Sequence, residues 1–175
     1  MDDYLKSILD QFEYYKQLGE NTFNQIPAEK LFWKLNKESN SIAIIVKHLH
    51  GNMLSRWTNF LTSDGEKDLR KRDQEFVDDI KSKTELLNKW NEGWDCLFKA
   101  IKNLNDNDLT KIVYIRNKEH SVTEAIHRQL AHYSFHVGQI VYLGKIICGN
   151  NWNSLSIPKG KSDDFNSEQF SKNKP

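Results

Sequence analysis

The sequence has few prolines, few cysteines and no long apolar run. It contains three prolines, none of them between residues 28 and 157, so long helices can form across that interval. Its two cysteines, Cys96 and Cys148, show no paired spacing, which suits reduced thiols in a cytoplasm. No apolar stretch approaches the about 20 residues that a membrane-spanning helix needs. We therefore expect a cytoplasmic protein with no membrane segment.

An excess of charge of either sign is also missing. The 25 lysines and arginines oppose 24 aspartates and glutamates, and a net charge of +1 argues against nucleic-acid binding. The one basic run, "EKDLRKRD" (Glu66–Asp73), is mixed with acids, and we expect it to be a solvated connector. The N-terminal segment is acidic at its start and amphipathic, so it does not predict a signal peptide.

Apolar residues at helical spacing predict four long helices in one domain of ordinary size. The predicted helices are Asp2–Leu18, Ser41–Leu61, Ser82–Ile101 and Val122–Ile147. We expect Gly19 to end the first of them, because glycine is the commonest residue just after a helix.

Local signals mark the ends of these helices and the segments between them. Ser82 and Ser121 each precede a glutamate by three residues, which is the spacing of a capping box. Between the last two helices, "KIVYIRNKEHSV" breaks the helical period and predicts a short hairpin or extended excursion. The whole pattern predicts an all-α four-helix bundle over residues 1–157. We expect the polar tail, residues 158–175, to be extended over the surface.

All six histidines lie between residues 48 and 136, and two of them stand four residues apart in "HYSFHVGQI". His132 and His136 therefore project from one helix face, where two imidazoles can chelate one first-row metal ion. The pair alone is a weak motif, because two core or surface histidines give the same spacing. A usable site needs a third protein ligand, and the second helix offers His48 or His50 in "VKHLHGNM".

Helical spacing alone does not choose between His48 and His50. His50 lies nearer the middle of the apolar stripe of its helix, where a core side chain is expected. His48 lies beside a polar row formed by Asn52 and Arg56, which a metal pocket would need. Because a bundle helix can be buried on more than one side, both candidates stay open at this point.

The last helix adds Gln129 to the face of the histidine pair, whereas His127 lies well off that face and is expected at the surface. Two other metal chemistries fit less well. A zinc protease of the HExxH type needs a glutamate inside the motif, and none lies between these two histidines. A di-iron carboxylate bundle needs two ExxH motifs, and only Glu124–His127 has this spacing.

The segments "SIAIIVKHLHGNMLSRW" and "RQLAHYSFHVGQIVYLGK" together resemble the DinB/YfiT-like superfamily of metal-dependent proteins, and more narrowly a bacterial branch of it. "SDGEK" and "SLSIPKGKS" are similar to the same branch, so the resemblance covers nearly the whole chain. It implies a four-helix bundle, usually dimeric, with three histidines that hold one divalent metal ion. These ligands fall on His48, His132 and His136, while His50 stands where a small residue is expected.

The resemblance also implies a chemistry. A three-histidine site with open coordination positions leaves room for a substrate atom, and its metal can lower the pKa of a bound thiol. Thiol transferases occur in the superfamily, which implies a small thiol and an electrophile as substrates. Asn52, Arg56 and Gln129 are then candidates for lining the pocket. The alternative is a non-catalytic, dimeric metal-binding bundle with a stress-related or structural role. Three imidazoles suit zinc, nickel, iron or copper.

Overall fold

The computed structural model describes residues 3–172, over which the chain is mostly helical with one small two-stranded sheet, so the all-α prediction is confirmed in its broad form. The long helices are α1 (Asp3–Gln25), α2 (Ile42–Trp57), α3 (Lys83–Lys102) and α4 (Val122–Cys148), and a fifth, α5, covers Ser162–Ser171. The strands are β1 (Ile112–Ile115) and β2 (Lys118–Ser121), and the short 3-10 helices are η1 (Ala28–Phe32), η2 (Arg72–Phe76), η3 (Asp106–Asp108) and η4 (Gly149–Asn151).

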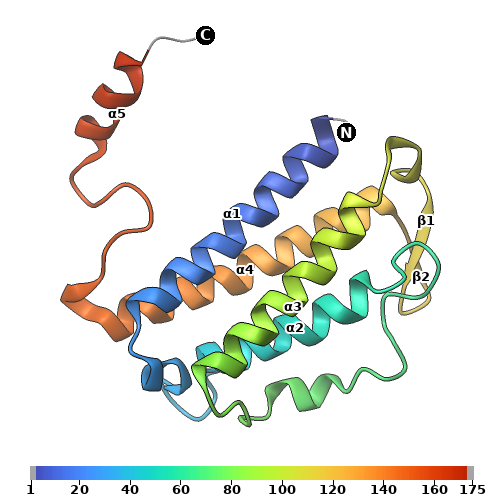
Figure 1. Ribbon diagram of the computed structural model, residues 1–175, viewed down its shortest axis with the longest axis horizontal. Coiled ribbons are helices and arrows are strands. Elements are labelled where there is room, and N and C mark those ends of the chain that lie inside the picture. The colour runs from blue at the N-terminus through green and yellow to red at the C-terminus, as the bar shows by residue number, and fades with distance from the viewer. Residues whose placement is uncertain (1–2, 173–175) are drawn as a thin grey trace.

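The four long helices run side by side, and each packs against two others (Figure 1). Helix α1 contacts α3 and α4, and α2 contacts the same two helices. The faces that the four helices turn toward one another form a continuous hydrophobic core. Aromatic side chains account for much of this core, and the largest of those that are fully buried are Trp90, Trp94, Tyr133, Phe12 and Phe23.

The first helix is longer than its sequence predicts. Gly19 does not end it, because α1 continues to Gln25. A Cβ atom at position 19 would come 2.5 Å from the indole of Trp90, so this glycine permits α1 and α3 to approach closely. The prediction of a helix stop was therefore wrong, since the reason for the glycine is tertiary packing. The predicted first helical residue, Asp2, lies outside the described residues.

The second helix is shorter than predicted at its C-terminal end. The side chain of Ser41 accepts a hydrogen bond from the backbone N–H of Ile44, which caps the start of α2. The helix ends at Trp57, and Asn59 takes a left-handed conformation with φ of 50°. The apolar pattern continues through Phe60 and Leu61, but these residues lie in the turn that follows.

The predicted starts of the last two long helices are confirmed. The side chain of Ser82 accepts a hydrogen bond from the backbone N–H of Glu85 at the start of α3. Ser121 and Glu124 form a reciprocal capping box at the start of α4. Gly149, with φ of 53°, follows the last residue of α4, a position where glycine is favoured.

The excursion before α4 is a hairpin, which confirms the predicted break in helical structure. Strands β1 and β2 are antiparallel, and Ile115 pairs with Lys118. The two residues between them, Arg116 and Asn117, have φ values of 56° and 60°. Positive φ at both central positions is typical of the tight turns that match the twist of a two-stranded ribbon.

The polar tail is not extended throughout, contrary to the prediction, because α5 occupies Ser162–Ser171. None of its side chains is buried, and it stands apart from the four long helices (Figure 1). Asp163 and Asp164 lie in its first turn, where negative charge favours a helix N-terminus. Residues 173–175 of the tail lie outside the described residues. No helix within residues 3–172 is both long enough and apolar enough to cross a membrane.

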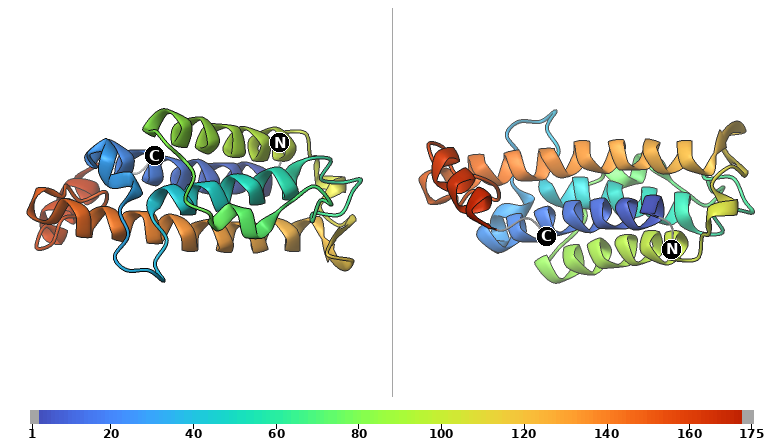
Figure 2. Two further views of the ribbon diagram at one scale, coloured as in Figure 1. Left: turned by 90° about the horizontal axis from the view of Figure 1, so that it is seen from below. Right: turned by 90° about the horizontal axis from the view of Figure 1, so that it is seen from above.

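The connector between α2 and α3 is only partly solvated. Within the run Glu66–Asp73, the side chain of Arg70 is 4% exposed, so the expectation of a fully solvated segment was wrong here. Figure 2 shows this connector, with η2, lying along α2. The reason is electrostatic, because Arg70 pairs with the buried Glu75.

Candidate metal centre

Helices α2 and α4 bring three histidines together at their interface. His48 comes from α2, while His132 and His136 come from successive turns of α4, and one ring nitrogen of each lies within 4.8 Å of the other two. The Nε2 atom of His132 is 3.3 Å from that of His48 and 3.1 Å from that of His136. Nitrogen ligands of a tetrahedral zinc ion, at about 2.0–2.1 Å from the metal, stand about 3.3 Å from one another. The observed separations match that spacing.

Hydrogen bonds on the outer side of two rings decide which nitrogen faces the centre. Nδ1 of His48 lies 2.8 Å from Oε2 of Glu75, and an ionised carboxylate can only accept, so this Nδ1 carries the proton. Nδ1 of His136 lies 2.8 Å from Oε1 of Gln139, which also accepts. In the neutral form of each ring, Nε2 therefore presents a lone pair to the centre, as metal-ligating histidines do when an outer partner holds Nδ1–H.

The histidines of α4 are neutral at pH 7. Burial, together with the nearby His136 and His48, lowers the pKa of His132 to about 3. Burial also lowers the pKa of His136, although its hydrogen bond to Gln139 acts in the opposite direction. A neutral imidazole has one N–H, so His132 can donate to only one of the two inward lone pairs. When all three rings are neutral, at least one lone pair thus finds no proton among them, and a cation would satisfy it.

Two residues of the connector contact the His48 ring. Glu75 accepts the Nδ1 proton of His48, and the Phe76 ring stacks on the imidazole with 4.9 Å between centroids. Arg70 holds the carboxylate with two hydrogen bonds, from Nε to Oε1 at 2.7 Å and from Nη2 to Oε2 at 2.8 Å. Gly51 leaves room for this arrangement, because a Cβ there would collide with the carboxylate of Glu75.

Glu75 is ionised in spite of its burial. Burial by itself raises the pKa of this carboxyl group, but the hydrogen bonds from His48 and Arg70 and the charge of Arg70 bring the pKa below its ordinary value. Neither Glu75 nor Arg70 was predicted as part of the site. They lie in a segment without helical periodicity, and 27 residues separate His48 from Glu75 along the chain.

The three predicted pocket-lining residues have different surroundings. Asn52 is buried and accepts a hydrogen bond from the hydroxyl of Tyr133 at 3.0 Å. Arg56 is also buried and pairs with Glu66 at 3.0 Å. Gln129 is 3% exposed, and its Oε1 atom has no hydrogen-bond partner within the part of the chain that the structure describes. The role of these residues in lining a substrate pocket stays a prediction, with Gln129 as the residue that has a spare acceptor.

The other histidines of interest lie elsewhere. His50 does not join the cluster, because its Nε2 lies 2.9 Å from Oε2 of Glu92 on α3. His127 is exposed, as expected, and its Nε2 lies 3.2 Å from the hydroxyl of Tyr4. The structure thus places His48, and not His50, beside the pair on α4.

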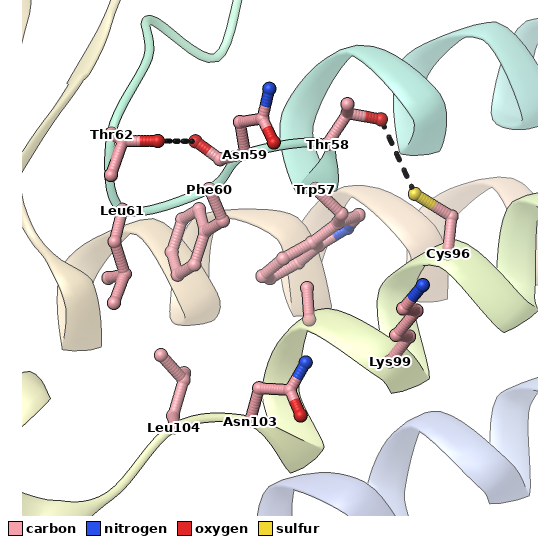
Figure 3. Close-up of a pocket in the computed structure, with 11 residues that line it drawn as sticks. Trp57, Thr58, Asn59, Phe60, Leu61, Thr62, Cys96, Lys99, Asn103 and Leu104 are labelled. Atoms are coloured by element: carbon pink, nitrogen blue, oxygen red, sulfur yellow. Dashed lines mark hydrogen bonds between the residues drawn. The ribbon is translucent and has the colours of Figure 1, made fainter.

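A separate pocket of about 420 Å³ lies at the C-terminal ends of α2 and α3 (Figure 3). Trp57 and Phe60 form one wall, and the thiol of Cys96 lies 3.7 Å from the hydroxyl of Thr58. None of the three clustered histidines lines this pocket. Cys96 is therefore not placed to serve the histidine centre.

A family comparison covers most of the chain. The model of a family described as "Protein of unknown function (DUF1572)" matches residues 1–161, which end immediately before α5 begins. Because the match spans far more than half of the chain, the protein belongs to this family. No curated protein matches the sequence. The function therefore has to be argued from the histidine centre itself.

Proposed function

We propose that this chain is a DinB/YfiT-like four-helix-bundle protein that binds one divalent metal ion at His48, His132 and His136. The observation that carries the proposal is the convergence of three imidazole nitrogens, with Nε2 separations of 3.3 and 3.1 Å from His132. The orientation of two rings by Glu75 and Gln139 supports it. The packing of each long helix against two others supports the bundle type.

The proposed activity is a metal-dependent thiol transferase. Three protein ligands leave at least one coordination position open, as in catalytic rather than structural zinc sites, and no fourth His, Cys, Asp or Glu joins the group within residues 3–172. Zinc, nickel or iron, when bound, would lower the pKa of a small thiol. Such a thiol would lose its proton to solvent, and its sulfur would bond to the electrophilic atom while the leaving group departed with its electron pair.

The protein's own residues have separate tasks in this scheme. His132 and His136 supply uncharged nitrogens, so no proton has to be displaced from them at neutral pH. Glu75 keeps the proton of His48 on Nδ1. Gln129 lies on the helix face of the pair, and its buried Oε1 has no hydrogen-bond partner among residues 3–172, which makes it the acceptor that we propose for a substrate.

A homodimer is part of the proposal. Phe135, Tyr142 and Ile146 are 61%, 66% and 40% exposed, and their spacing places them on one outer face of α4. Exposed apolar residues in a contiguous stripe mark interaction surfaces more often than isolated ones do. We propose that a second copy covers this stripe. Tyr142→Glu should then give a monomer in analytical ultracentrifugation, and an unchanged dimer would place the interface elsewhere.

The metal content of untagged protein tests the central claim. Elemental mass spectrometry should find close to one divalent ion per chain, and His132→Ala should lose it. His127→Ala is the matched control, because this exposed histidine on the same helix lies outside the cluster. Protein that stays metal-free after incubation with zinc, nickel and iron would refute the proposal. Metal-loaded protein that consumes no thiol in a screen of electrophiles would favour the non-catalytic, stress-related or structural alternative.

A further inference from the structure

A second cavity lies behind the histidine centre, on the other side of Glu75. It is a groove of about 610 Å³ between α2, the connector and α3. Its basic lining residues are Lys47, His50, Lys67, Arg70, Lys71 and Lys89. Neither His132 nor His136 lines it. We propose that this groove binds a small organic anion with an apolar body.

Three of these six basic residues already lie within ion-pair distance of a carboxylate. Lys47 lies 2.6 Å from Asp79, and Arg70 is held by Glu75. His50 lies 2.9 Å from Glu92.

The other three basic residues have no carboxylate within ion-pair distance among residues 3–172. Lys67 donates to the backbone carbonyl of Asp64, and burial lowers the pKa of its ammonium group. Lys71 is exposed and Lys89 is half-buried. Carboxylates act on two of them only from beyond ion-pair distance, Asp64 on Lys67 and Asp79 on Lys89. Three ammonium groups without a direct ion pair thus line one groove, and an anionic group could bond to them.

The groove also offers apolar surface. Leu54 lies on its α2 side, and Leu69 from the connector is 92% exposed. The aliphatic stems of lysines add to this surface, because only the end of the side chain is charged. A ligand with a hydrophobic body and one anionic group would cover Leu69 and reach the ammonium groups at the same time.

The size and charge of the groove favour a small molecule over a nucleic acid. Its volume lies within the roughly 300–1,000 Å³ that is typical of small-molecule sites. The chain as a whole carries a net charge of +1, so it lacks the extended positive surface that a phosphate backbone needs.

The groove is separate from the proposed catalytic centre. Glu75 and Arg70 both line it, and Glu75 also accepts the Nδ1 proton of His48. The Glu75 side chain therefore forms a wall between the anion groove and the cluster of imidazole nitrogens. An occupant of the groove lies behind this wall and does not bind to the metal.

Benzyl phosphate is a suitable probe, because it combines an aromatic ring with a dianion. Titrated into ¹⁵N-labelled full-length protein, it should cause saturable amide shifts confined to α2, the connector and the first half of α3. Benzyl alcohol, which has the same ring without the charge, should cause no saturable shifts. The titration is repeated after chelation of metal and should give the same map, so that a failure of the metal proposal does not affect this test.

Two double variants decide whether the groove lysines bind the probe. Lys71→Gln/Lys89→Gln removes two ammonium groups that make no ion pair with any described residue, and it should weaken binding about tenfold or more. Lys6→Gln/Lys37→Gln removes the same charge from exposed positions outside the groove and should leave the affinity unchanged. Shifts that are scattered or do not saturate would overturn the proposal. So would equal losses of affinity in the two variants.

Discussion

Replacing Glu75 by glutamine tests whether the carboxylate that accepts the Nδ1 proton of His48 controls metal affinity. Oε2 of Glu75 accepts hydrogen bonds from Nδ1 of His48 and Nη2 of Arg70, both at 2.8 Å, and Oε1 accepts from Nε of Arg70 at 2.7 Å. Glutamine has almost the same shape, but one of its two terminal atoms is an NH₂ group, which donates. In either orientation this nitrogen faces at least one N–H donor, so at least one hydrogen bond is lost.

The expected loss has two parts. Removing the outer carboxylate partner of a metal-ligating histidine costs about 10- to 100-fold in metal affinity. This corresponds to about 1.4–2.7 kcal/mol. In addition, leaving a buried donor of Arg70 unpaired costs about 1–3 kcal/mol in the stability of the metal-free protein. Arg70 keeps its ion pair with Glu66 at 3.2 Å, which limits this second loss.

Competition with a chromogenic chelator measures the zinc affinity of Glu75→Gln, and urea unfolding in EDTA measures its stability. Glu92→Gln is the matched control, because Glu92 also bonds a histidine, His50, at 2.9 Å, but its side chain is 63% exposed and lies outside the cluster. We expect the control to bind zinc like the wild type. Equal affinities for wild type and Glu75→Gln would refute the reasoning, as would equal losses in the two variants.

Three further changes test the packing and the charge state of the chain. Gly19→Ala should lower the free energy of unfolding by about 1–3 kcal/mol, because the added methyl group would meet Trp90. Gly138→Ala is the control: it has open space around it and should raise the free energy of unfolding by up to about 1 kcal/mol. Similar urea midpoints for the two variants would contradict this reasoning. Tyr133→Phe should cost about 1–3 kcal/mol, because it removes the hydroxyl that joins two buried polar groups, and an unchanged urea midpoint would show that the hydroxyl contributes nothing. The pKa of His132 is about 3 in the folded state and about 6.5 in an unfolded chain, so the unfolded chain binds the proton more readily. Metal-free protein should therefore lose stability as the pH falls from about 6.5 toward 3. Urea unfolding in EDTA at several pH values should show a shallower loss for His132→Gln, and identical slopes would exclude burial of His132 as a cause.

Several features could be predicted from sequence because they depend on residues a few positions apart. Ser82 and Ser121 cap helices through backbone N–H groups three residues ahead. The spacing of His132 and His136 places them on one helix face whatever surrounds them. The break before α4 follows from a β-branched run and a turn that suits left-handed backbone. Each of these features depends only on residues that are close in the sequence, so it does not require a particular tertiary structure.

Other features depend on contacts between distant segments, and only the tertiary structure decided them. Gly19 is inside a helix because Trp90 of α3 occupies the space beside it. Helical spacing alone left both His48 and His50 as candidates for the third metal ligand. The packing of α2 against α4 places His48 beside the histidine pair, and its packing against α3 places His50 beside Glu92. The partner of His48 comes from a connector without periodicity, because an ion pair with Arg70 stabilises a buried carboxylate there. No local pattern encodes such a contact, since its free energy arises only when the segments are already packed together.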